Sequence, residues 1–290
     1  MTRTYDRASE DIGNLVLLEH VNVTHSDQAP TTLFWVLALG GTRDPYLMVE
    51  LDNMWVNYGR TQVHLPTRPP VQVLRGTIGF VVPSLDELRA RMERVAPRLA
   101  GTRFAWREAT GTIEATCPWG NRVRCHAPSA EFGANVQLGL AYVEFDVPRG
   151  TADGIARFYT EIVGSRGRVA ERRGAAAAHV PVGNAQAMWF VETDAPLPPY
   201  DGHHVQVYIA DFSGPYRKLM ERGLITLETD AHEWRFQKIV DPASGKLLFE
   251  VEHEVRSLRH PLYARPMVNR NPAVRNTNYV PGTDAFRGTY

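Results

Sequence analysis

The amino-acid sequence predicts an α+β protein made of four copies of one unit, each a strand, a helix and three further strands. The first observation behind this prediction is an internal repeat. The strand at 20–23 and the helix end at 34–40 recur at 144–147 and 158–164, each 124 residues from its counterpart. The second is that the strand–helix–three-strand order can be followed four times along the chain. A constant offset across a strand, a loop and a helix end indicates an internal duplication.

The repeated segment has a simple physical interpretation. Alternating polar and apolar residues indicate a half-buried strand, and a polar loop then leads into a short helix whose aromatic pair faces the sheet. Gly40 and Gly164 stand where this helix should end in the left-handed conformation that glycine adopts easily. The strand carries one ionisable side chain at the equivalent position, His20 in one copy and Glu144 in the other.

The other elements follow in the same order. Ser84 and Glu87 form a capping box at the start of the second helix. The sequence predicts helices at 28–40, 84–99, 151–164 and 212–222. It predicts strands at 15–24, 45–50, 54–58, 61–65, 76–82, 104–107, 111–116, 121–126, 140–147, 167–172, 175–181, 186–192, 203–209, 224–229, 234–240 and 246–252.

Composition excludes several classes of protein. Hydrophobic residues make up 43% of the 290 positions and charged residues 22%, as in globular proteins. The formal net charge is zero, so neither nucleic acid nor a membrane surface is an expected partner. The polar N-terminus is unlike a secretory signal, and Cys117 and Cys125 are too few for a disulfide framework, so we expect a cytoplasmic protein. No Gly-rich phosphate loop follows a strand.

Four such units, with their aromatic helices and the Asp-Pro…Gly hairpin at 241–245, resemble the vicinal oxygen chelate superfamily. That group includes glyoxalase I, bleomycin- and fosfomycin-resistance proteins and extradiol dioxygenases. The resemblance covers about residues 15–255 and is greatest to a two-domain extradiol dioxygenase. It implies that the units pair into two open mixed β-barrel domains. The expected divisions are an N-terminal extension at 1–14, a first domain at 15–130, a second domain at 131–255 and an irregular C-terminal tail at 256–290.

The resemblance also implies a metal site in the second barrel. Its ligand positions correspond to Glu144, Glu192, His204 and Glu250. Carboxylates with one imidazole suit a divalent Fe, Mn, Ni, Co or Zn ion. The hairpin before Glu250 is one residue longer than the usual family turn, so a shift of register by one residue would put Phe249 at the ligand position and turn Glu250 away. Glu252, which shares the face of Glu250, is the alternative. Glu144 stands where an extradiol enzyme has histidine, which argues against ordinary catechol cleavage.

The equivalent positions of the first barrel are His20, His64, Thr77 and Arg124. Because threonine is a poor ligand and arginine is none, we expect no complete metal site there. His20, His64 and Gln206 are instead candidates for substrate binding. Tyr208, on the strand face of His204, and His232, before the last hairpin, are candidate catalytic residues. The plainer interpretations are hydrogen-bonded core histidines for His20 and His64, and an exposed loop histidine for His232.

Two functions remain open at this point. The first is a metal-dependent dioxygenase, lyase or isomerase whose metal chelates vicinal oxygens of a small carbonyl or phenolic molecule. The alternative is a metal-free protein of the same fold that binds or sequesters a small molecule. In either case the expected partner is a small-molecule substrate, and a homo-oligomer such as a dimer is compatible with the resemblance. Elemental analysis of the purified protein discriminates between the two.

Overall fold

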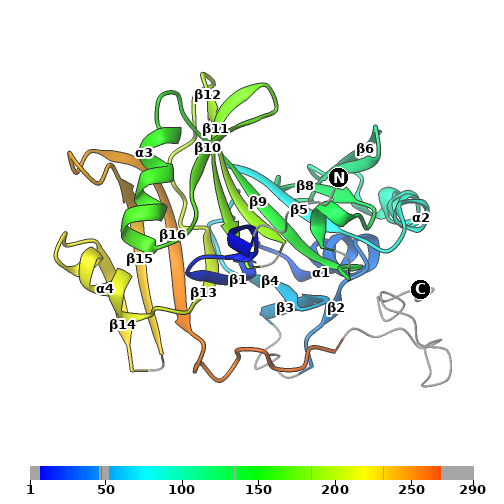
Figure 1. Ribbon diagram of the computed structural model, residues 1–290. Helices are drawn as coiled ribbons and strands as arrows, with labels where there is room; N and C mark the ends of the chain where they lie inside the picture. The colour runs from blue at the N-terminus through cyan, green and yellow to red at the C-terminus, as the bar shows by residue number, and fades with distance from the viewer. Residues whose placement is uncertain are drawn as a thin grey trace, which may run out of the picture.

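The structure is a computed structural model that describes residues 7–45, 47, 52–133, 135–183, 185–230 and 232–268. Within them, two eight-stranded mixed sheets account for the named strands (Figure 1). Sheet I has the order β14-β15-β16-β13-β1-β4-β3-β2, and sheet II the order β10-β11-β12-β9-β5-β8-β7-β6. The strands of sheet I are β1 (Leu15–Asn22), β2 (Thr42–Arg43), β3 (Asn53–Tyr58), β4 (Thr61–Pro66), β13 (His204–Ile209), β14 (Ile225–Thr229), β15 (Glu233–Val240) and β16 (Leu247–Ser257). Those of sheet II are β5 (Gly76–Val81), β6 (Ala105–Ala109), β7 (Thr112–Thr116), β8 (Arg122–His126), β9 (Gly139–Pro148), β10 (Arg168–Arg172), β11 (Ala175–Val182) and β12 (Gln186–Thr193).

The predicted α+β fold of four units is confirmed, but the pairing of the units is not the expected one. Sheet I joins the first unit to the fourth through the antiparallel pair β1 and β13, and sheet II joins the second to the third through β5 and β9. The expectation that each half of the chain, 15–130 and 131–255, closes its own barrel is therefore wrong. The 124-residue offset relates the first unit to the third and does not indicate which unit either of them joins, so the repeat cannot distinguish the two pairings.

The helices, unlike the strands, contact the helices of the neighbouring unit in the same half of the chain. The helices are α1 (Gln28–Thr32), which continues as the π-helical segment Leu33–Ala38, α2 (Leu85–Val95), α3 (Ala152–Arg157), which continues as the π-helical segment Phe158–Val163, and α4 (Ser213–Met220); short 3-10 segments lie at Arg7–Glu10, Ala96–Leu99 and Ala130–Phe132. Arg91 Nε of α2 donates to the carbonyl oxygen of Ala38 (2.9 Å), and Lys218 Nζ of α4 donates to that of Glu161 (2.7 Å). The helices of the first and second units therefore contact each other, as do those of the third and fourth units, although the strands of these units belong to different sheets.

Local sequence signals account for the ends of these helices. The hydroxyl of Ser84 accepts a hydrogen bond from the backbone N–H of Glu87, which confirms the capping box. Gly40 and Gly164 have φ angles of 83° and 82°, the left-handed conformation predicted at both helix ends. The predicted strand at 45–50 falls largely outside the described residues.

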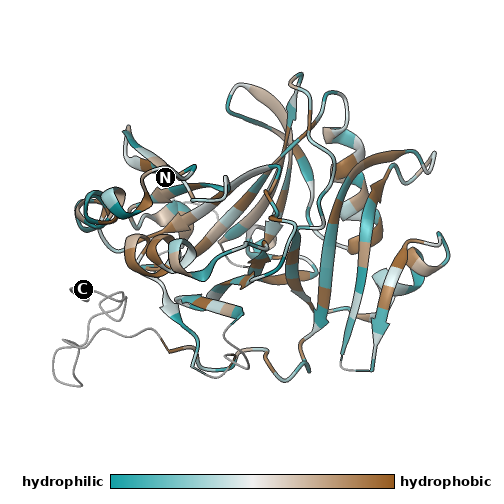
Figure 2. Cartoon of the chain, turned by 180° about the vertical axis from the view of Figure 1, so that it is seen from behind, coloured by the Kyte–Doolittle hydropathy of each residue, from teal (hydrophilic) through white to brown (hydrophobic). Residues whose placement is uncertain are grey.

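One hydrophobic cluster runs through both sheets, and the brown stretches in Figure 2 follow it along the strands and the inner helix faces. Polar side chains also connect the sheets. The amide Nε2 of Gln186 donates to the carbonyl oxygens of Leu18 in sheet I and Leu140 in sheet II, both at 2.8 Å. In the part of the chain that the structure describes, no helix is both long enough and apolar enough to cross a membrane.

Candidate metal centre in sheet I

The candidate site lies on one face of sheet I, where four neighbouring strands from the first and fourth units meet. Strand register builds it: His20 of β1 stands opposite Gln206 of β13, and Gln206 stands opposite Glu254 of β16. On the other side of β1, His20 pairs with Gln62 of β4. Because side chains of paired residues point to the same face, this face is polar although it is buried.

Three side chains on this face form the centre, with His204 two residues before Gln206 on β13. His20, His204 and Glu254 each offer one ligand atom, and these atoms all lie within 4.8 Å of one another. Their exposed fractions are 0%, 8% and 3%. Both ring nitrogens of His20 are buried without a hydrogen-bond partner. Buried polar atoms nearly always have a partner, so an unpartnered imidazole that faces a second imidazole and a carboxylate calls for an explanation. Burial lowers the pKa of His20 well below its usual range, so the ring is neutral and can act as a ligand.

His64 stands beside this cluster and is not one of its three ligands. Its ring stacks on Trp55 with 3.7 Å between centroids, and its Nε2 lies 2.6 Å from Oδ1 of Asn53. The ring centroid of His20 is 6.0 Å away. Burial lowers the pKa of His64 to about 2, so this imidazole is also neutral. It therefore forms a fixed wall of the site.

Two arginines hold the carboxylate. Nη2 of Arg235 lies 2.7 Å from Glu254, and Arg256 forms an ion pair with the other oxygen of Glu254. Nε2 of His204 lies 3.3 Å from Glu254. Burial acts to raise the pKa of Glu254, but the hydrogen bond with His204 and the charge of Arg256 hold it well below its usual range. Glu254 is thus an ionised carboxylate in a buried setting.

The same face carries further polar groups. Gln206 is fully buried, and both its amide nitrogen and its amide oxygen lack a hydrogen-bond partner. The hydroxyl of Tyr208 lies 3.4 Å from Glu19, whose pKa burial raises to about 7 against the lowering effect of Arg256. An amide with a free donor and a free acceptor is a hydrogen-bonding handle for a small molecule.

The described part of the C-terminal tail leaves β16 and passes the ends of the strands of sheet I (Figure 1). Tyr263 packs on Tyr208 with 4.9 Å between ring centroids. Further along, Arg265 pairs with Asp44, and the carbonyl oxygen of Val268 accepts a hydrogen bond from Asn57 (3.1 Å). Strand β16 includes the first two residues of the expected tail, and residues 258–268 lie outside the named strands and connect the fourth unit to the first across sheet I.

The predicted ligand set Glu144, Glu192, His204 and Glu250 is not one site. Glu144 and Glu192 belong to sheet II, whereas His204 and Glu250 belong to sheet I, so the expected grouping is wrong. Glu144 is fully buried between Arg172 (2.9 Å) and Arg173 (2.8 Å). Glu192 accepts a hydrogen bond from the backbone N–H of Ala152 at the start of α3.

The two remaining predictions concern the fourth unit. Glu250 lies four residues before Glu254 on β16, on the same face of the strand. It accepts a hydrogen bond from Gln237 (3.3 Å). The alternative, Glu252, lies 3.6 Å from Nδ1 of His204 and pairs with Arg235. His232 sits exposed in the turn between β14 and β15 with a φ angle of 63°, and its catalytic role stays a prediction.

Glu254 is the residue that the sequence interpretation missed. Glu250, Glu252 and Glu254 alternate along β16, so all three share one face of the sheet. The register of β16 on β13 places Glu252 opposite His204 and Glu254 opposite Gln206. Continuing the alternation past Glu252 was the available signal, but the sequence does not show how far β16 extends.

Comparison with known proteins supports the fold. No family model matches the sequence, and no curated protein is similar to it in sequence. A dioxygenase-type protein from Bacillus subtilis is similar in structure, with a TM-score of 0.58, 12% identity and coverage of 86% of each chain. Glyoxalase I from Zea mays gives a TM-score of 0.55 at 13% identity over 84% of this chain and 93% of its own. The cppA protein from Streptococcus pneumoniae gives 0.50 at 9% identity over 84% and 99%.

Proposed function

From the vicinal oxygen chelate fold of this chain, we propose that His20, His204 and Glu254 hold a divalent metal ion, at which the protein acts on a small carbonyl-bearing or phenolic molecule. The observation that carries this proposal is the fully buried imidazole of His20. Among the described residues its two nitrogens have no hydrogen-bond partner, with Glu19 3.6 Å from Nδ1, and it faces a second imidazole and an ionised carboxylate within ligand distance of each other. Leaving such a group unpartnered costs stability, which a bound cation offsets.

The donor set fits a transition ion. Two imidazoles and one carboxylate are the ligands of open-sided iron sites, and Mn, Co, Ni and Zn accept the same donors. When bound, the ion supplies Lewis-acid polarisation of a substrate oxygen. Arg235 and Arg256 then act as outer partners that orient Glu254, as hydrogen-bonded second neighbours do around ligating carboxylates.

The residues around the ligands suit a small oxygenated molecule. Gln206 can donate one hydrogen bond and accept another, because neither end of its amide is occupied. The Trp55–His64 stack offers a flat wall beside the ligands. Tyr208, held near Glu19, carries a hydroxyl that can donate a proton to a bound oxygen. These groups bind and orient the substrate and exclude water from it.

A metal-free binding protein is the second candidate, and one observation favours it. Each oxygen of Glu254 already has a guanidinium partner, which stabilises the carboxylate without a cation. In that case Gln206 and the neutral imidazoles would bind a small molecule directly.

Titration of chelator-treated protein tests the metal proposal. The purified chain is titrated with Fe²⁺, Mn²⁺, Co²⁺, Ni²⁺ and Zn²⁺ in turn, and binding is followed by calorimetry and elemental analysis. We expect about one ion per chain, a higher melting temperature with the ion, and loss of both in His20→Ala. The matched control is His126→Ala, which removes a half-buried histidine of sheet II. If no ion binds, the metal-free candidate stands; if His20→Ala binds the ion as well as wild type, the assignment of the ligands to this centre is wrong.

A further inference from the structure

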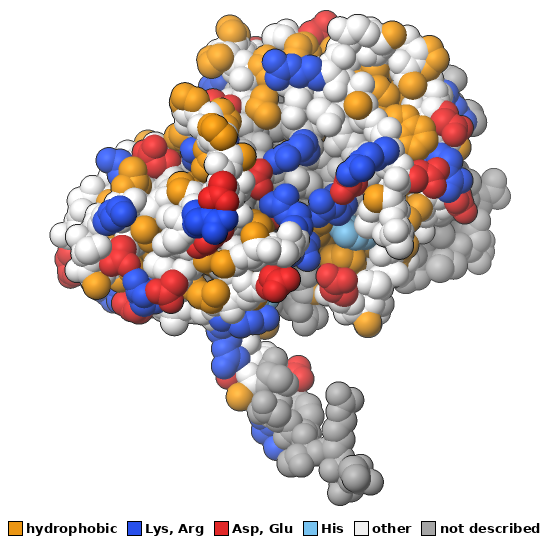
Figure 3. Space-filling view, turned by 90° about the horizontal axis from the view of Figure 1, so that it is seen from above, with side chains coloured by type: hydrophobic (Ala, Val, Ile, Leu, Met, Phe, Trp, Pro, Cys, Tyr) orange, Lys and Arg blue, Asp and Glu red, His pale blue; other side chains and the backbone are white. Residues whose placement is uncertain are grey.

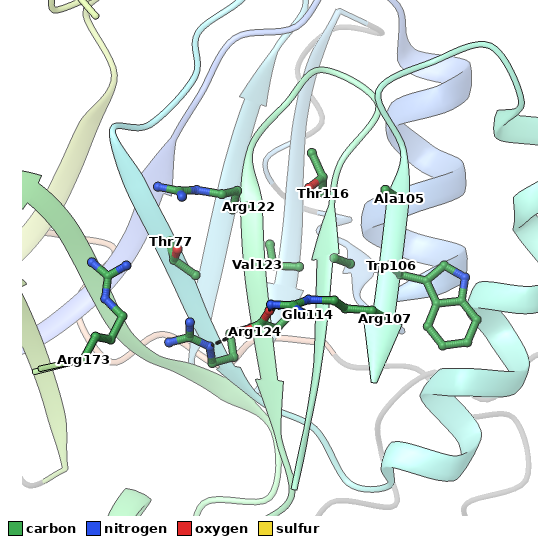
Figure 4. A pocket seen from close by; sticks show the side chains of 11 residues that line it. Thr77, Ala105, Trp106, Arg107, Glu114, Thr116, Arg122, Val123, Arg124 and Arg173 are labelled. Atoms are coloured by element: carbon green, nitrogen blue, oxygen red, sulfur yellow. Dashed lines mark hydrogen bonds and ion pairs between the residues drawn. The ribbon is translucent and has the colours of Figure 1, made fainter. Parts of the chain in front are cut away.

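Sheet II presents arginines on the face that corresponds to the candidate metal centre. We define the arginine cluster as Arg107, Arg122, Arg124, Arg172 and Arg173. Arg107 comes from β6, Arg122 and Arg124 from β8, and the other two from the end of β10 and the turn after it. In Figure 4 Arg107, Arg122 and Arg124 extend from β6 and β8, and Arg173 lies on the opposite side of Thr77. The cluster thus gathers cations from both units of the sheet.

Among the residues that the structure describes, three carboxylates form ion pairs with these five guanidinium groups. Glu114 pairs with Arg107 (2.6 Å) and Arg124 (3.0 Å). The fully buried Glu144 pairs with Arg172 and Arg173. Asp146 pairs with Arg122 (2.6 Å) and with Arg173 (2.7 Å).

The cluster therefore carries two more positive charges than negative ones. An ion-pair network that only stabilises the sheet gains nothing from extra like charges, because they repel one another. A guanidinium group also has five N–H donors, and these carboxylates occupy one or two on each arginine. Two positive charges and several guanidinium N–H donors are therefore available for another partner.

The excess charge surrounds a cavity of about 420 Å³. Arg107, Arg122, Arg124 and Arg173 line it together with Thr77, and Glu114 is the one carboxylate among the lining residues. This volume is in the range of small-molecule sites. In Figure 3 basic side chains gather around a hollow on the upper face of the molecule.

We propose that this cavity of sheet II binds a small organic dianion, a dicarboxylate or a phosphate monoester, at a site separate from the metal centre of sheet I. Arginine forks match carboxylate and phosphate oxygens in pairs, and two negative charges neutralise the excess of the cluster. A metal ion is not the expected ligand, because guanidinium groups keep their charge and repel cations.

Calorimetric titration with inorganic phosphate and with succinate tests the proposal, at constant ionic strength and on the full chain. The test variant is Arg107→Gln/Arg122→Gln. It keeps one arginine for Glu114 and one for Asp146, and it leaves both partners of the buried Glu144 in place. The matched control is Arg89→Gln/Arg149→Gln. It removes the same number of charges from arginines that pair with Glu108 and Asp194 outside the cavity.

We expect wild type and control to bind a probe with equal affinity, and the test variant to bind it at least about tenfold more weakly. Binding of phosphate alone assigns a phosphate monoester, and binding of succinate alone assigns a dicarboxylate. Metal content should be the same in all three proteins. Melting temperatures can be measured with the same probes. Because phosphate stabilises many proteins by exclusion from their surfaces, an increase in the melting temperature of wild type is evidence of binding only if it exceeds the increase seen in the test variant. If neither probe gives binding heat, or if the test variant binds as tightly as the control, the proposal is overturned.

Discussion

Sheets I and II are built from the same unit in the same strand order, yet their equivalent faces carry opposite chemistry. In sheet I the buried carboxylate of Glu254 is approached by His204 and lies near His20. In sheet II the buried carboxylate of Glu144 is enclosed by Arg172 and Arg173. A neutral imidazole has a lone pair for a cation, whereas guanidinium never loses its proton. Both carboxylates have two arginine partners, so the difference lies in the other basic side chains on each face: the imidazoles of His20 and His204 in sheet I, and further arginines in sheet II.

The largest expected difference between the sheets is in metal content. We predict that His204→Ala lowers occupancy from about one ion per chain to near zero, because one imidazole and one carboxylate hold a transition ion weakly. The fold should survive, since the backbone pairing of β13 does not depend on this side chain. Elemental analysis and circular dichroism measure the two outcomes.

The matched variant for this comparison is His179→Ala in sheet II. His179 packs its ring on Trp189 at 4.1 Å between centroids, away from the centre in sheet I. It should keep full occupancy. If both variants retain the ion, it is held elsewhere; if both lose it, the loss reports general damage to the protein.

The second difference concerns what a buried carboxylate does for stability. We predict that Glu144→Gln lowers the free energy of unfolding by about 3 kcal/mol, because it leaves two part-buried guanidinium groups without their shared anion. Metal content should not change. Urea denaturation measures the loss, and Glu114→Gln, at a side chain 25% exposed, should cost less than about 1 kcal/mol. Equal costs at the two positions would show that burial of Glu144 is not the source of the effect.

Sequence alone could predict the unit but not the partner of each unit. The capping box at Ser84 and the helix ends at Gly40 and Gly164 are local signals, and the structure confirms all three. Pairing of β1 with β13 is a contact between residues about 190 positions apart, and no local signal encodes it. His20 and His204 were both singled out by their strand positions, yet they were assigned to different barrels for this reason. Glu254 was missed because the length of β16 is likewise set by its neighbours.

The junction between the sheets offers a third, smaller test. Gln186 donates to Leu18 and Leu140 and accepts from the backbone N–H of Leu18 at 3.0 Å. We predict that Gln186→Met costs about 2 kcal/mol, because these buried backbone groups lose their partner. The control is Gln237→Met, whose amide has one long contact with Glu250 and should cost less than about 0.5 kcal/mol. An unchanged midpoint for Gln186→Met in urea would mean that the sheets are held together by apolar packing alone.

The smallest expected effect is an increase in the free energy of unfolding. It distinguishes residues of the site from residues that stabilise the fold within sheet I. Gln206 and Gln62 flank His20 on the neighbouring strands β13 and β4, and both are buried. The amide of Gln62 donates to Asp44 and Asn57, whereas that of Gln206 has no partner.

Replacing an unpartnered buried amide with an apolar group of similar size removes a desolvation cost, so Gln206→Met should raise the free energy of unfolding by about 0.5–1 kcal/mol. Gln62→Met should lower it by about 1–2 kcal/mol, because Asp44 and Asn57 then lose a donor. Both shifts can be read from denaturant midpoints at equal slope. If Gln206→Met is destabilised as much as Gln62→Met, the Gln206 amide serves the fold and is not held in reserve for a bound molecule.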